Sequence, residues 1–237
     1  MIDFESFRLA ASTNTLESEP RARPHADLLE FRMDLAADPL AELERYDGEL
    51  EILVTNRPEW EGGNRADGTD RREELLDALS MPAVTGIDLE LRALEGTGQI
   101  TDMSPVLDAA RESGRSVVVS VHDFDRGPSR RTLVDFAHRG CQFGSIAKLA
   151  VTPKTHEAVL ELLQATHDLT REGKTVATMG MGEIGAHTRA VSPLYGSKLG
   201  YAPLEATDAT APGQFDLETL ASLLETFGVR DGSDLKT

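Results

Sequence analysis

Hydrophobic residues along the chain fall into short runs rich in β-branched residues and leucine, separated by longer segments in which they recur every three or four positions. The short runs are typical of buried strands, and the longer segments are typical of helices with one apolar side. Val159, Leu162 and Leu169, for example, share one side of a predicted helix. The predicted strands are Phe7–Ala11, Leu28–Met33, Leu50–Asn56, Ala83–Leu91, Ser116–His122, Ser145–Val151, Thr175–Met179 and Lys198–Pro203.

Strand and helix therefore alternate through the 237 residues. This alternation predicts an α/β fold, namely a closed parallel (β/α)8 TIM barrel that forms one domain over residues 1–237. A doubly wound open sheet would give much the same alternation and is the alternative. The first connection, Thr13–Asp27, is expected to be irregular, because Pro20 and Pro24 interrupt any helix there.

The net charge of the chain indicates which classes of partner it can bind. It carries 41 acidic residues against 24 basic ones, which gives a formal charge of −17. Because nucleic acids attract basic surfaces, this excess argues against a nucleic-acid partner. Halophilic proteins use such acid-rich surfaces, so we predict a salt-loving host; an ordinary acidic cytosolic protein is the alternative.

Cysteine content and hydropathy indicate the compartment. The single cysteine, Cys141, excludes an internal disulfide, and no apolar stretch approaches the roughly 20 residues of a membrane span. The N-terminal residues also lack the pattern of a signal peptide. We therefore expect a cytoplasmic protein that has no membrane partner.

Lys148 interrupts the otherwise apolar run Ser145–Val151, in a chain that has only five lysines. A lone ammonium in a buried strand is costly, so we expect it either to be paired or to lose its proton and become a nucleophile. The preceding strand ends in His122, about one strand–helix unit upstream. A Schiff-base lysine beside an acid–base histidine is our leading hypothesis.

Position along the chain separates His122 from the other histidines. A single histidine is more often structural than catalytic, but only His122 ends an apolar strand. The histidines in polar segments are His25, His138, His156, His167 and His187. No pair of them has metal-ligand spacing supported by a cysteine cluster, so we predict neither a metal site nor a cofactor.

Charged residues alternate with apolar ones in two of the predicted strands. Period two puts Glu30 and Arg32 on one face of the second strand, and Asp88 and Glu90 on one face of the fourth. In a barrel these faces point inward, close to the active site at the C-terminal strand ends. A buried ion-pair lattice and direct contact with a substrate are equally compatible with this pattern.

Three predicted loops carry further candidates. Arg57 follows the third strand, and Glu61-Gly-Gly63 comes next in a loop whose glycines allow tight backbone paths. The glycine-rich segment Thr178–Gly185 precedes Arg189, which should open a helix, so a phosphorylated substrate is a serious competitor. The turn Thr210–Gln214 presents a hydroxyl and an amide, which suits a polyhydroxylated ligand or an ordinary loop.

The short motifs occur in this order: Glu30-Phe-Arg32-Met-Asp34, Arg57 with Glu61-Gly-Gly63, Asp88-Leu-Glu90, Ser120-Val-His122-Asp-Phe124, Lys148-Leu-Ala150, Met179-Gly-Met181-Gly182, Thr188-Arg189, Gly196-Ser197 and Ala211-Pro-Gly-Gln214. As an ordered set that spans nearly the whole chain, they resemble type I 3-dehydroquinate dehydratase. That family of the shikimate pathway removes water from 3-dehydroquinate to give 3-dehydroshikimate. It has a (β/α)8 barrel, which agrees with the independent strand count.

The resemblance implies a role for each candidate residue. Lys148 would form an iminium at C3 of the substrate, and His122 would take the C2 proton and protonate the departing C1 hydroxyl. The amine must be neutral to attack, which burial and the nearby arginines would favour. Glu61 would orient His122, and Arg189 would bind the substrate carboxylate through two hydrogen bonds. The other implied substrate-binding residues are Glu30, Arg32, Arg57, Met179, Met181, Tyr201, Thr210 and Gln214.

The chain departs from the family pattern in a few places. Thr210 and Thr188 stand where the family usually has serine, and both retain a hydroxyl. Tyr201 matches the aromatic residue over the substrate ring with a slightly different spacing to Gln214. Relatives in the family are often dimers, so a homodimer is expected from the resemblance alone.

Two other functions are compatible with the residues. A class I aldolase also uses a Schiff-base lysine in a barrel but acts on phosphorylated ketoses. A non-catalytic small-molecule-binding barrel is the second alternative, against which the presence of both Lys148 and His122 argues.

Overall fold

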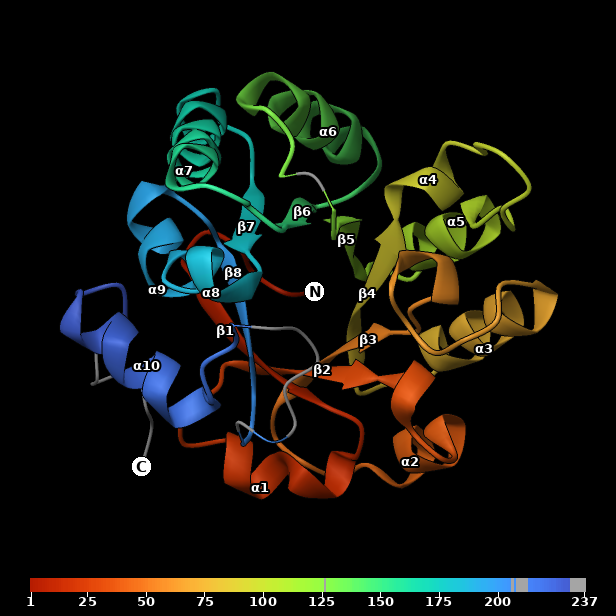
Figure 1. Ribbon diagram of the computed structural model, residues 1–237. Coiled ribbons are helices and arrows are strands. Elements are labelled where there is room, and N and C mark those ends of the chain that lie inside the picture. Colours follow the sequence, from red (N-terminus) through yellow and green to blue (C-terminus); the bar gives the residue numbers. More distant parts are fainter. Residues whose placement is uncertain (126, 206, 208–212, 231–237) are drawn as a thin grey trace.

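Eight parallel strands form one sheet around a central axis, and helices surround it (Figure 1). The computed structural model describes residues 1–125, 127–205, 207 and 213–230. The strands are β1 (Arg8–Thr13), β2 (Leu28–Arg32), β3 (Glu51–Thr55), β4 (Val84–Glu90), β5 (Ser116–Asp123), β6 (Ile146–Val151), β7 (Val176–Gly180) and β8 (Leu199–Pro203). Each lies within two residues of its predicted position, and the predicted (β/α)8 barrel is confirmed.

The strand order distinguishes the barrel from an open doubly wound sheet. Neighbouring strands follow the chain from β1 to β7, and β8 pairs with β1. Between β7 and β8, the Lys198 backbone N–H donates to the Val176 carbonyl at 2.8 Å, and Val176 forms a bridge with Ser197. The sheet therefore returns on itself, which a doubly wound sheet does not do.

Most of the connecting helices lie on the outside of the sheet (Figure 1). The helices are α1 (Glu19–Ala22), α2 (Pro39–Arg45), α3 (Thr69–Leu79), α4 (Leu91–Leu94), α5 (Ser104–Glu112), α6 (Arg130–Phe143), α7 (His156–Arg171), α8 (Gly182–Gly185), α9 (Thr188–Val191) and α10 (Leu217–Thr226). Short 3₁₀ turns are η1 (Leu16–Ser18), η2 (Met33–Leu35), η3 (Glu59–Glu61) and η4 (Ser192–Tyr195). The described helices are too short or too polar to cross a lipid bilayer.

The first connection is irregular, as the two prolines predicted. It consists of the 3₁₀ turn η1 followed by the four-residue helix α1, and Pro20 lies in the first turn of α1. Proline is tolerated there because its missing N–H would have no partner within the helix. The segment after Ala22 turns directly into β2 through a hydrogen bond from the Asp27 N–H to the Leu9 carbonyl, 2.9 Å long.

Side chains that point into the barrel change from apolar to polar along the strands. Leu28, Val118 and Ile146 belong to an apolar cluster at the N-terminal ends of the strands, and Ile2 packs into the same cluster. Two residues further along the same inward faces stand Glu30, Ser120 and Lys148, all buried. The apolar half closes one end of the barrel, and the polar half faces the C-terminal ends of the strands, where barrel active sites lie.

Candidate active site

Lys148 lies near the middle of the barrel and is 4% exposed. Its Nζ donates a hydrogen bond to Asp88 Oδ2 at 3.0 Å and lies 3.5 Å from Glu30 Oε1. On its other side Nζ lies 4.0 Å from the centre of the Tyr201 ring. The ammonium is therefore compensated by two carboxylates and the electron-rich face of an aromatic ring.

The partners of Lys148 differ from the sequence-based expectation in one respect. Arginines were expected beside the amine, whereas its ion-pair partners are Asp88 and Glu30. The arginine on this side of the barrel, Arg57, is itself paired with Asp88 at 2.7 Å. Pairing of the lysine is thus what offsets the cost of its burial.

Glu30 is held by hydroxyl groups from both neighbouring strands. Ser12 donates to Glu30 Oε2 at 2.5 Å, and Thr55 donates to Glu30 Oε1 at 3.1 Å. In the parallel register Ser12 on β1 lies opposite Glu30 on β2, and Thr55 on β3 lies opposite Arg32, so that Thr55 is a diagonal neighbour of Glu30. Glu30 therefore belongs to the ion-pair lattice, and it also lines the pocket.

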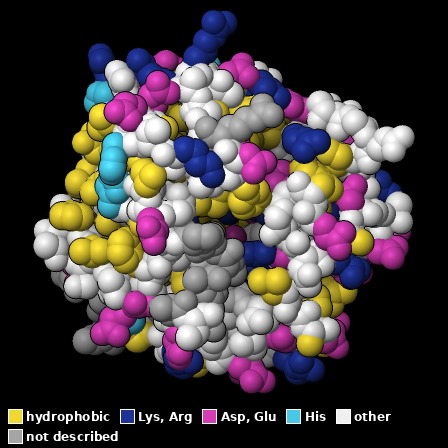
Figure 2. Space-filling model, viewed as in Figure 1, with side chains coloured by type: hydrophobic (Ala, Val, Ile, Leu, Met, Phe, Trp, Pro, Cys, Tyr) yellow, Lys and Arg dark blue, Asp and Glu magenta, His cyan; other side chains and the backbone are white. Residues whose placement is uncertain are grey.

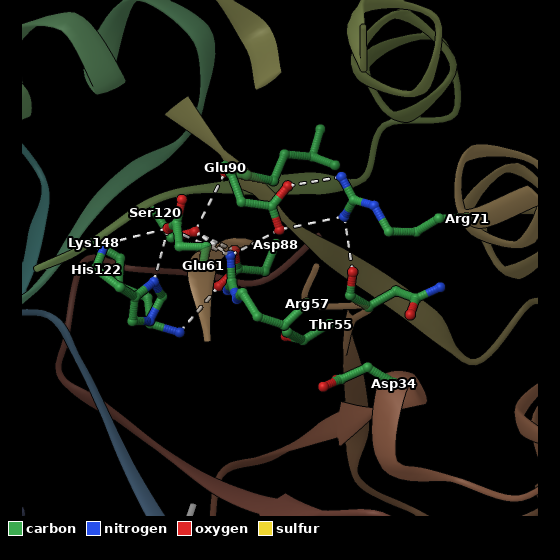
Figure 3. A network of polar contacts seen from close by, with 12 residues as sticks. Asp34, Thr55, Arg57, Glu61, Arg71, Asp88, Glu90, Ser120, His122 and Lys148 are labelled. Carbon is green, nitrogen blue, oxygen red and sulfur yellow. Dashed lines mark hydrogen bonds and ion pairs between the residues drawn. The ribbon is translucent and has the colours of Figure 1, made fainter. Parts of the chain in front are cut away.

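Arg57 lines the pocket and lies at the centre of an ion-pair lattice in its wall (Figure 3). Its Nη1 lies 2.9 Å from Glu90 Oε1 and donates to Ser120 Oγ at 2.7 Å. Although burial alone would lower the pKa of Arg57, the carboxylates of Asp88 and Glu90 raise it above its ordinary value. Arg57 thus remains a fixed positive charge, and Asp88 and Glu90 belong to the lattice.

The charge of Asp88 is fixed as well. Burial would raise the pKa of this carboxyl, but Arg57 and Lys148 hold it well below its usual range. Ser120, which donates to Asp88 Oδ1 at 2.7 Å, lies opposite Lys148 in the register of β5 and β6. Asp88 therefore links the central arginine to the lysine through permanent charge.

Glu61, which is buried, and His122, which is partly buried, form a pair at the edge of the pocket. His122 Nδ1 lies 2.9 Å from Glu61 Oε1, and the His122 backbone N–H donates to the same oxygen at 3.2 Å. Burial, together with Arg57 and Lys148, lowers the pKa of His122 well below its ordinary value. Burial, reinforced by Glu90 and Asp88, raises the pKa of Glu61 to about 8. Both shifts favour the uncharged form, so near neutral pH the imidazole is free to accept a proton.

A tight loop after β3 places Glu61. Pro58 and Arg65 pair across it, and the Gly63 N–H donates to the Pro58 carbonyl at 3.0 Å. A Cβ atom on Gly63 would lie 2.0 Å from the Arg57 carbonyl oxygen, so only glycine fits. Gly62 has a φ of 79° and packs against the ring of Phe124, which stacks on His122. These two glycines have distinct roles, one in closing the loop and the other in admitting Phe124.

Arg189 enters the pocket from the short helix α9 and is 5% exposed. Among the described residues no carboxylate forms an ion pair with it, and its Nε has no hydrogen-bond partner. Burial lowers the pKa of Arg189 to about 10, so the side chain still carries its charge at neutral pH. A buried, unpaired guanidinium at the wall of a pocket is suited to bind an anion.

The other sequence-predicted residues lie around the same cavity. Arg32 is held by two hydrogen bonds to Asp34, of 2.8 and 2.7 Å, which fix its guanidinium at the pocket wall. The full set of lining residues is Ser12, Glu30, Arg32, Thr55, Arg57, Glu61, Gly62, His122, Phe124, Lys148, Ala150, Met179, Met181, Arg189, Tyr201 and Gln214. Figure 2 shows the molecule from this side, with a hollow near the centre of the face. Thr210, also predicted here, lies outside the described residues.

Sequence reasoning missed several residues of the site. Ser12 continues the inward face of Ala10, but the predicted first strand ended one residue short of it. Phe124 was visible only as part of a motif, two residues beyond His122. Asp34 follows Arg32 by two residues, and their pairing depends on the turn η2. No local signal indicated that Arg71, on the outer helix α3, reaches the lattice.

Within residues 1–125, 127–205, 207 and 213–230, no group of three or more His, Cys, Asp or Glu side chains is arranged to hold a metal ion. The carboxylates that gather near the pocket are engaged with arginine, lysine or hydroxyl groups. Lys148, His122 and Arg189 present an amine, an imidazole and a guanidinium to the pocket.

Comparison with known proteins agrees with this arrangement. The model of the type I 3-dehydroquinase family matches residues 11–231. The chain belongs to the type I 3-dehydroquinase family. A 3-dehydroquinate dehydratase of Haloarcula marismortui is 54% identical over 223 residues, which cover 94% of this chain and 97% of that protein. One of Halobacterium salinarum is 49% identical and covers 94% and 98% of the two chains.

Solved structures of type I 3-dehydroquinases and related enzymes show the same barrel. The crystal structure of 3-dehydroquinate dehydratase from Geobacillus kaustophilus superposes with a TM-score of 0.81 at 29% identity, covering 96% of this chain and 93% of that one. The resemblance that the motifs indicated is therefore confirmed, and the chain is an enzyme of this family. The two sequence relatives come from haloarchaea, with which the strongly acidic composition agrees.

Proposed function

We propose that this member of the type I 3-dehydroquinase family converts 3-dehydroquinate to 3-dehydroshikimate through a Schiff base on Lys148, with His122 as the general acid and base. One observation carries the proposal. Lys148 and His122 are diagonal neighbours on the inner faces of β6 and β5, because Lys148 pairs in register with Ser120 and His122 with Ala150. Both side chains line one pocket, to which the unpaired Arg189 also contributes.

The first step forms the imine. For its amine to attack the C3 ketone, Lys148 must give up a proton, and the Glu30 carboxylate lies within reach of Nζ to accept it, whereas Asp88 keeps its charge. The carbinolamine that results loses water to give an iminium, which withdraws electrons from the adjacent C2–H bond. The positive charge that the iminium carries replaces that of the ammonium, so the two carboxylates keep a cationic partner.

The second step eliminates the hydroxyl group. His122 takes the C2 proton, the electron pair forms the C2–C1 double bond, and the departing C1 hydroxyl accepts a proton from the imidazolium. Hydrolysis of the iminium then releases the product and restores Lys148. The water used in this hydrolysis balances the water lost in imine formation, so the net change is loss of one water from the substrate. The steps therefore require neither an oxidant nor an added cofactor.

Glu61 assists this transfer by orienting the imidazole. Its Oε1 contacts both Nδ1 and the backbone N–H of His122, so the ring has one orientation and its other nitrogen is left for the substrate. An uncharged Glu61–His122 pair can accept the C2 proton without first losing one. Glu61 therefore acts through His122 in this proposal.

The remaining pocket residues would bind the substrate. Arg189 offers a planar guanidinium for the ring carboxylate, while Arg32 and Gln214 face the hydroxyl groups. Met179, Met181 and Tyr201 give the pocket an apolar wall against which the ring can lie. Thr210 keeps its proposed contact from the sequence pattern alone.

Replacing Arg189 tests the proposed carboxylate contact. Arg189→Met should raise KM by roughly 100-fold and lower kcat less, because the contact is made in the substrate complex as well as in the transition state. Arg189→Lys should lie in between, since it restores the charge without the bidentate geometry. Arg111→Met, which removes an exposed arginine on α5, is the control. A normal KM for Arg189→Met would show that the carboxylate binds elsewhere.

The loop glycines provide a test of the Glu61 position. Gly63→Ala should lower kcat/KM by about 100-fold or more, because relief of the contact with the Arg57 carbonyl moves Glu61 away from His122. Gly68→Ala is the matched control in the same connection, since nothing lies within 4 Å of the added Cβ and its backbone is extended. Steady-state kinetics of the two variants should differ, and equal rates would contradict the placement of Glu61.

The direct test of the proposed function is turnover. Purified protein mixed with 3-dehydroquinate should produce the ultraviolet absorbance of the conjugated enone. A phosphorylated ketose that lacks a carboxylate should give no reaction, whereas a class I aldolase would cleave it. Saturable heat of binding without any absorbance change would identify a non-catalytic binder and refute the proposal.

A further inference from the structure

Arg71 is completely buried although it belongs to α3, a helix on the outside of the barrel. Its guanidinium reaches the Asn56 carbonyl, just after β3, and Glu90, the last residue of β4 (Figure 3). Arg71 itself does not line the pocket, and none of the catalytic steps proposed above uses it. Its burial therefore needs an explanation that the binding of substrate does not supply.

Arg71 contacts the two groups that hold Arg57 in place, namely the Glu90 carboxylate and the Asn56 backbone. Its Nη2 donates to Glu90 Oε2 at 3.0 Å, and its Nη1 lies 3.3 Å from Glu90 Oε1, the same oxygen that Arg57 Nη1 contacts at 2.9 Å. The Nη1 group also donates to the Asn56 carbonyl at 2.8 Å, immediately before Arg57 in the chain. Arg71 thus holds the backbone that leads into Arg57 and the carboxylate to which its guanidinium is bonded.

The position of Arg71 is unfavourable for the helix that carries it. It is the third residue of α3, so its positive charge lies near the positive end of the helix dipole. Burial adds a desolvation cost, and Asp67, 3.6 Å from Nε, is a more distant partner than Glu90. A smaller apolar residue here would avoid both costs, which points to a role in the lattice rather than in α3.

We propose that Arg71 is a positioning residue for the dehydration. It holds Glu90 and the Asn56 backbone, and these two groups keep Arg57 in place. Arg57 in turn lies beside Glu61 and beside Asp88, the partner of Lys148. This inference rests on the proposed function. Arg57 lies 3.9 Å from Glu61 Oε1 and 2.7 Å from Asp88, so a displacement of Arg57 reaches both the histidine pair and the lysine pair. Arg71 never contacts the substrate in this account.

Loss of Arg71 also changes the charge next to the Glu61–His122 pair. Glu90 would then be paired with Arg57 alone, and the negative charge of Glu90 would favour protonation of both Glu61 and His122. The pKa of each should therefore rise, and the acid limb of the kcat/KM profile should move to higher pH. The groups that face the pair are Arg32 from β2, Arg57 from the end of β3, Asp88 and Glu90 from β4, Lys148 from β6, and Arg189 and Tyr201 across the pocket.

The experiment compares Arg71→Met, Arg71→Lys and the double variant Arg71→Met/Glu90→Gln in the full-length protein with 3-dehydroquinate. Arg71→Met should lower kcat about 10-fold or more with KM changed less than about 3-fold, and it should move the acid limb upward by roughly half a pH unit. Arg71→Lys should be intermediate, because it keeps the charge but cannot reach both partners. Glu90→Gln in the Arg71→Met background should move the acid limb back toward that of the wild type.

Arg230→Met is the matched control for a lost arginine. Arg230 also donates to a backbone carbonyl, that of His25, and to a carboxylate, that of Asp27, away from the pocket. Its loss should leave kcat and the pH profile unchanged. The same changes in Arg230→Met and Arg71→Met, or unfolding of both Arg71→Met and Arg71→Lys, would show that Arg71 serves the fold alone and would overturn the inference.

Reduction of the imine on Lys148 is measured by mass in the same samples. If the wild type forms no imine, the proposed function fails and this inference fails with it. If the wild type forms the imine while Arg71→Met keeps a normal kcat and pH profile, only the inference about Arg71 is refuted. The two failures are therefore distinguishable.

Discussion

Replacing Lys148 with methionine should lower kcat for 3-dehydroquinate by about four orders of magnitude or more, because in the part of the chain that the structure describes no other lysine lines the pocket. Methionine fills a similar volume, but the change leaves Glu30 without its ion-pair partner and Asp88 with Arg57 alone. Loss of one member of a buried pair costs about 3–5 kcal/mol of stability, so thermal unfolding should be measured together with turnover.

Lys148→Arg separates the chemistry from this structural effect. It keeps a positive charge between the two carboxylates but supplies no nucleophilic amine. We expect it to retain more stability than Lys148→Met while remaining equally inactive. A Lys148→Met protein that turned over at the wild-type rate would refute the imine mechanism.

Replacing His122 with alanine should lower kcat by about 100- to 10,000-fold, the usual contribution of a general acid and base. Imine formation needs no proton from C2, so a covalent adduct on Lys148 should still form with the substrate. Rapid quenching with borohydride followed by mass spectrometry should therefore detect the reduced adduct in an almost inactive protein. Formation of the adduct without turnover is the result that specifically identifies the role of His122.

His138→Ala is the control for this prediction. His138 also pairs with a carboxylate, Glu172, at 2.6 Å, but both side chains are exposed and neither lines the pocket. Its removal should leave kcat unchanged. Normal turnover by His122→Ala would show that another group moves the proton, and absence of the adduct would show that His122 is needed earlier, in imine formation.

The sequence was sufficient to predict the barrel because its signals are local. Apolar runs marked every strand within two residues, and proline positions marked the irregular first connection. Period two along the strands then placed Glu30 and Arg32 on one inward face, and both line the pocket. Lys148 stood out for the same reason, as a charge in an apolar strand.

The partners of these side chains could not be predicted in the same way. The pattern left open whether Asp88 and Glu90 form a lattice or meet the substrate, because the answer depends on which cations reach them across the barrel. Arg57 reaches them from β3 and Arg71 from α3, and the second contact spans the boundary between helix layer and sheet. Such contacts depend on how the helices pack on the sheet, and they produce no periodic pattern in the sequence.

The ion-pair partners and pKa values of the site residues could likewise not be predicted from the sequence. The amine of Lys148 is buried as expected and the expected arginines line the same pocket, but its ion-pair partners, Glu30 and Asp88, were not predicted. The pKa of Glu61, raised to about 8 by burial and then by Glu90 and Asp88, depends on how close the turn η3 lies to β4. Only Arg189 matched a simple rule, as a buried cation with a free face toward the pocket.

The most direct measurement of the central claim is borohydride reduction of the wild-type protein during turnover of 3-dehydroquinate, followed by peptide mass mapping. The imine mechanism predicts one stable adduct, located on the peptide that contains Lys148, and loss of activity in step with its formation. An unmodified Lys148 peptide in a protein that is turning over substrate, or an adduct confined to another lysine, would contradict the mechanism.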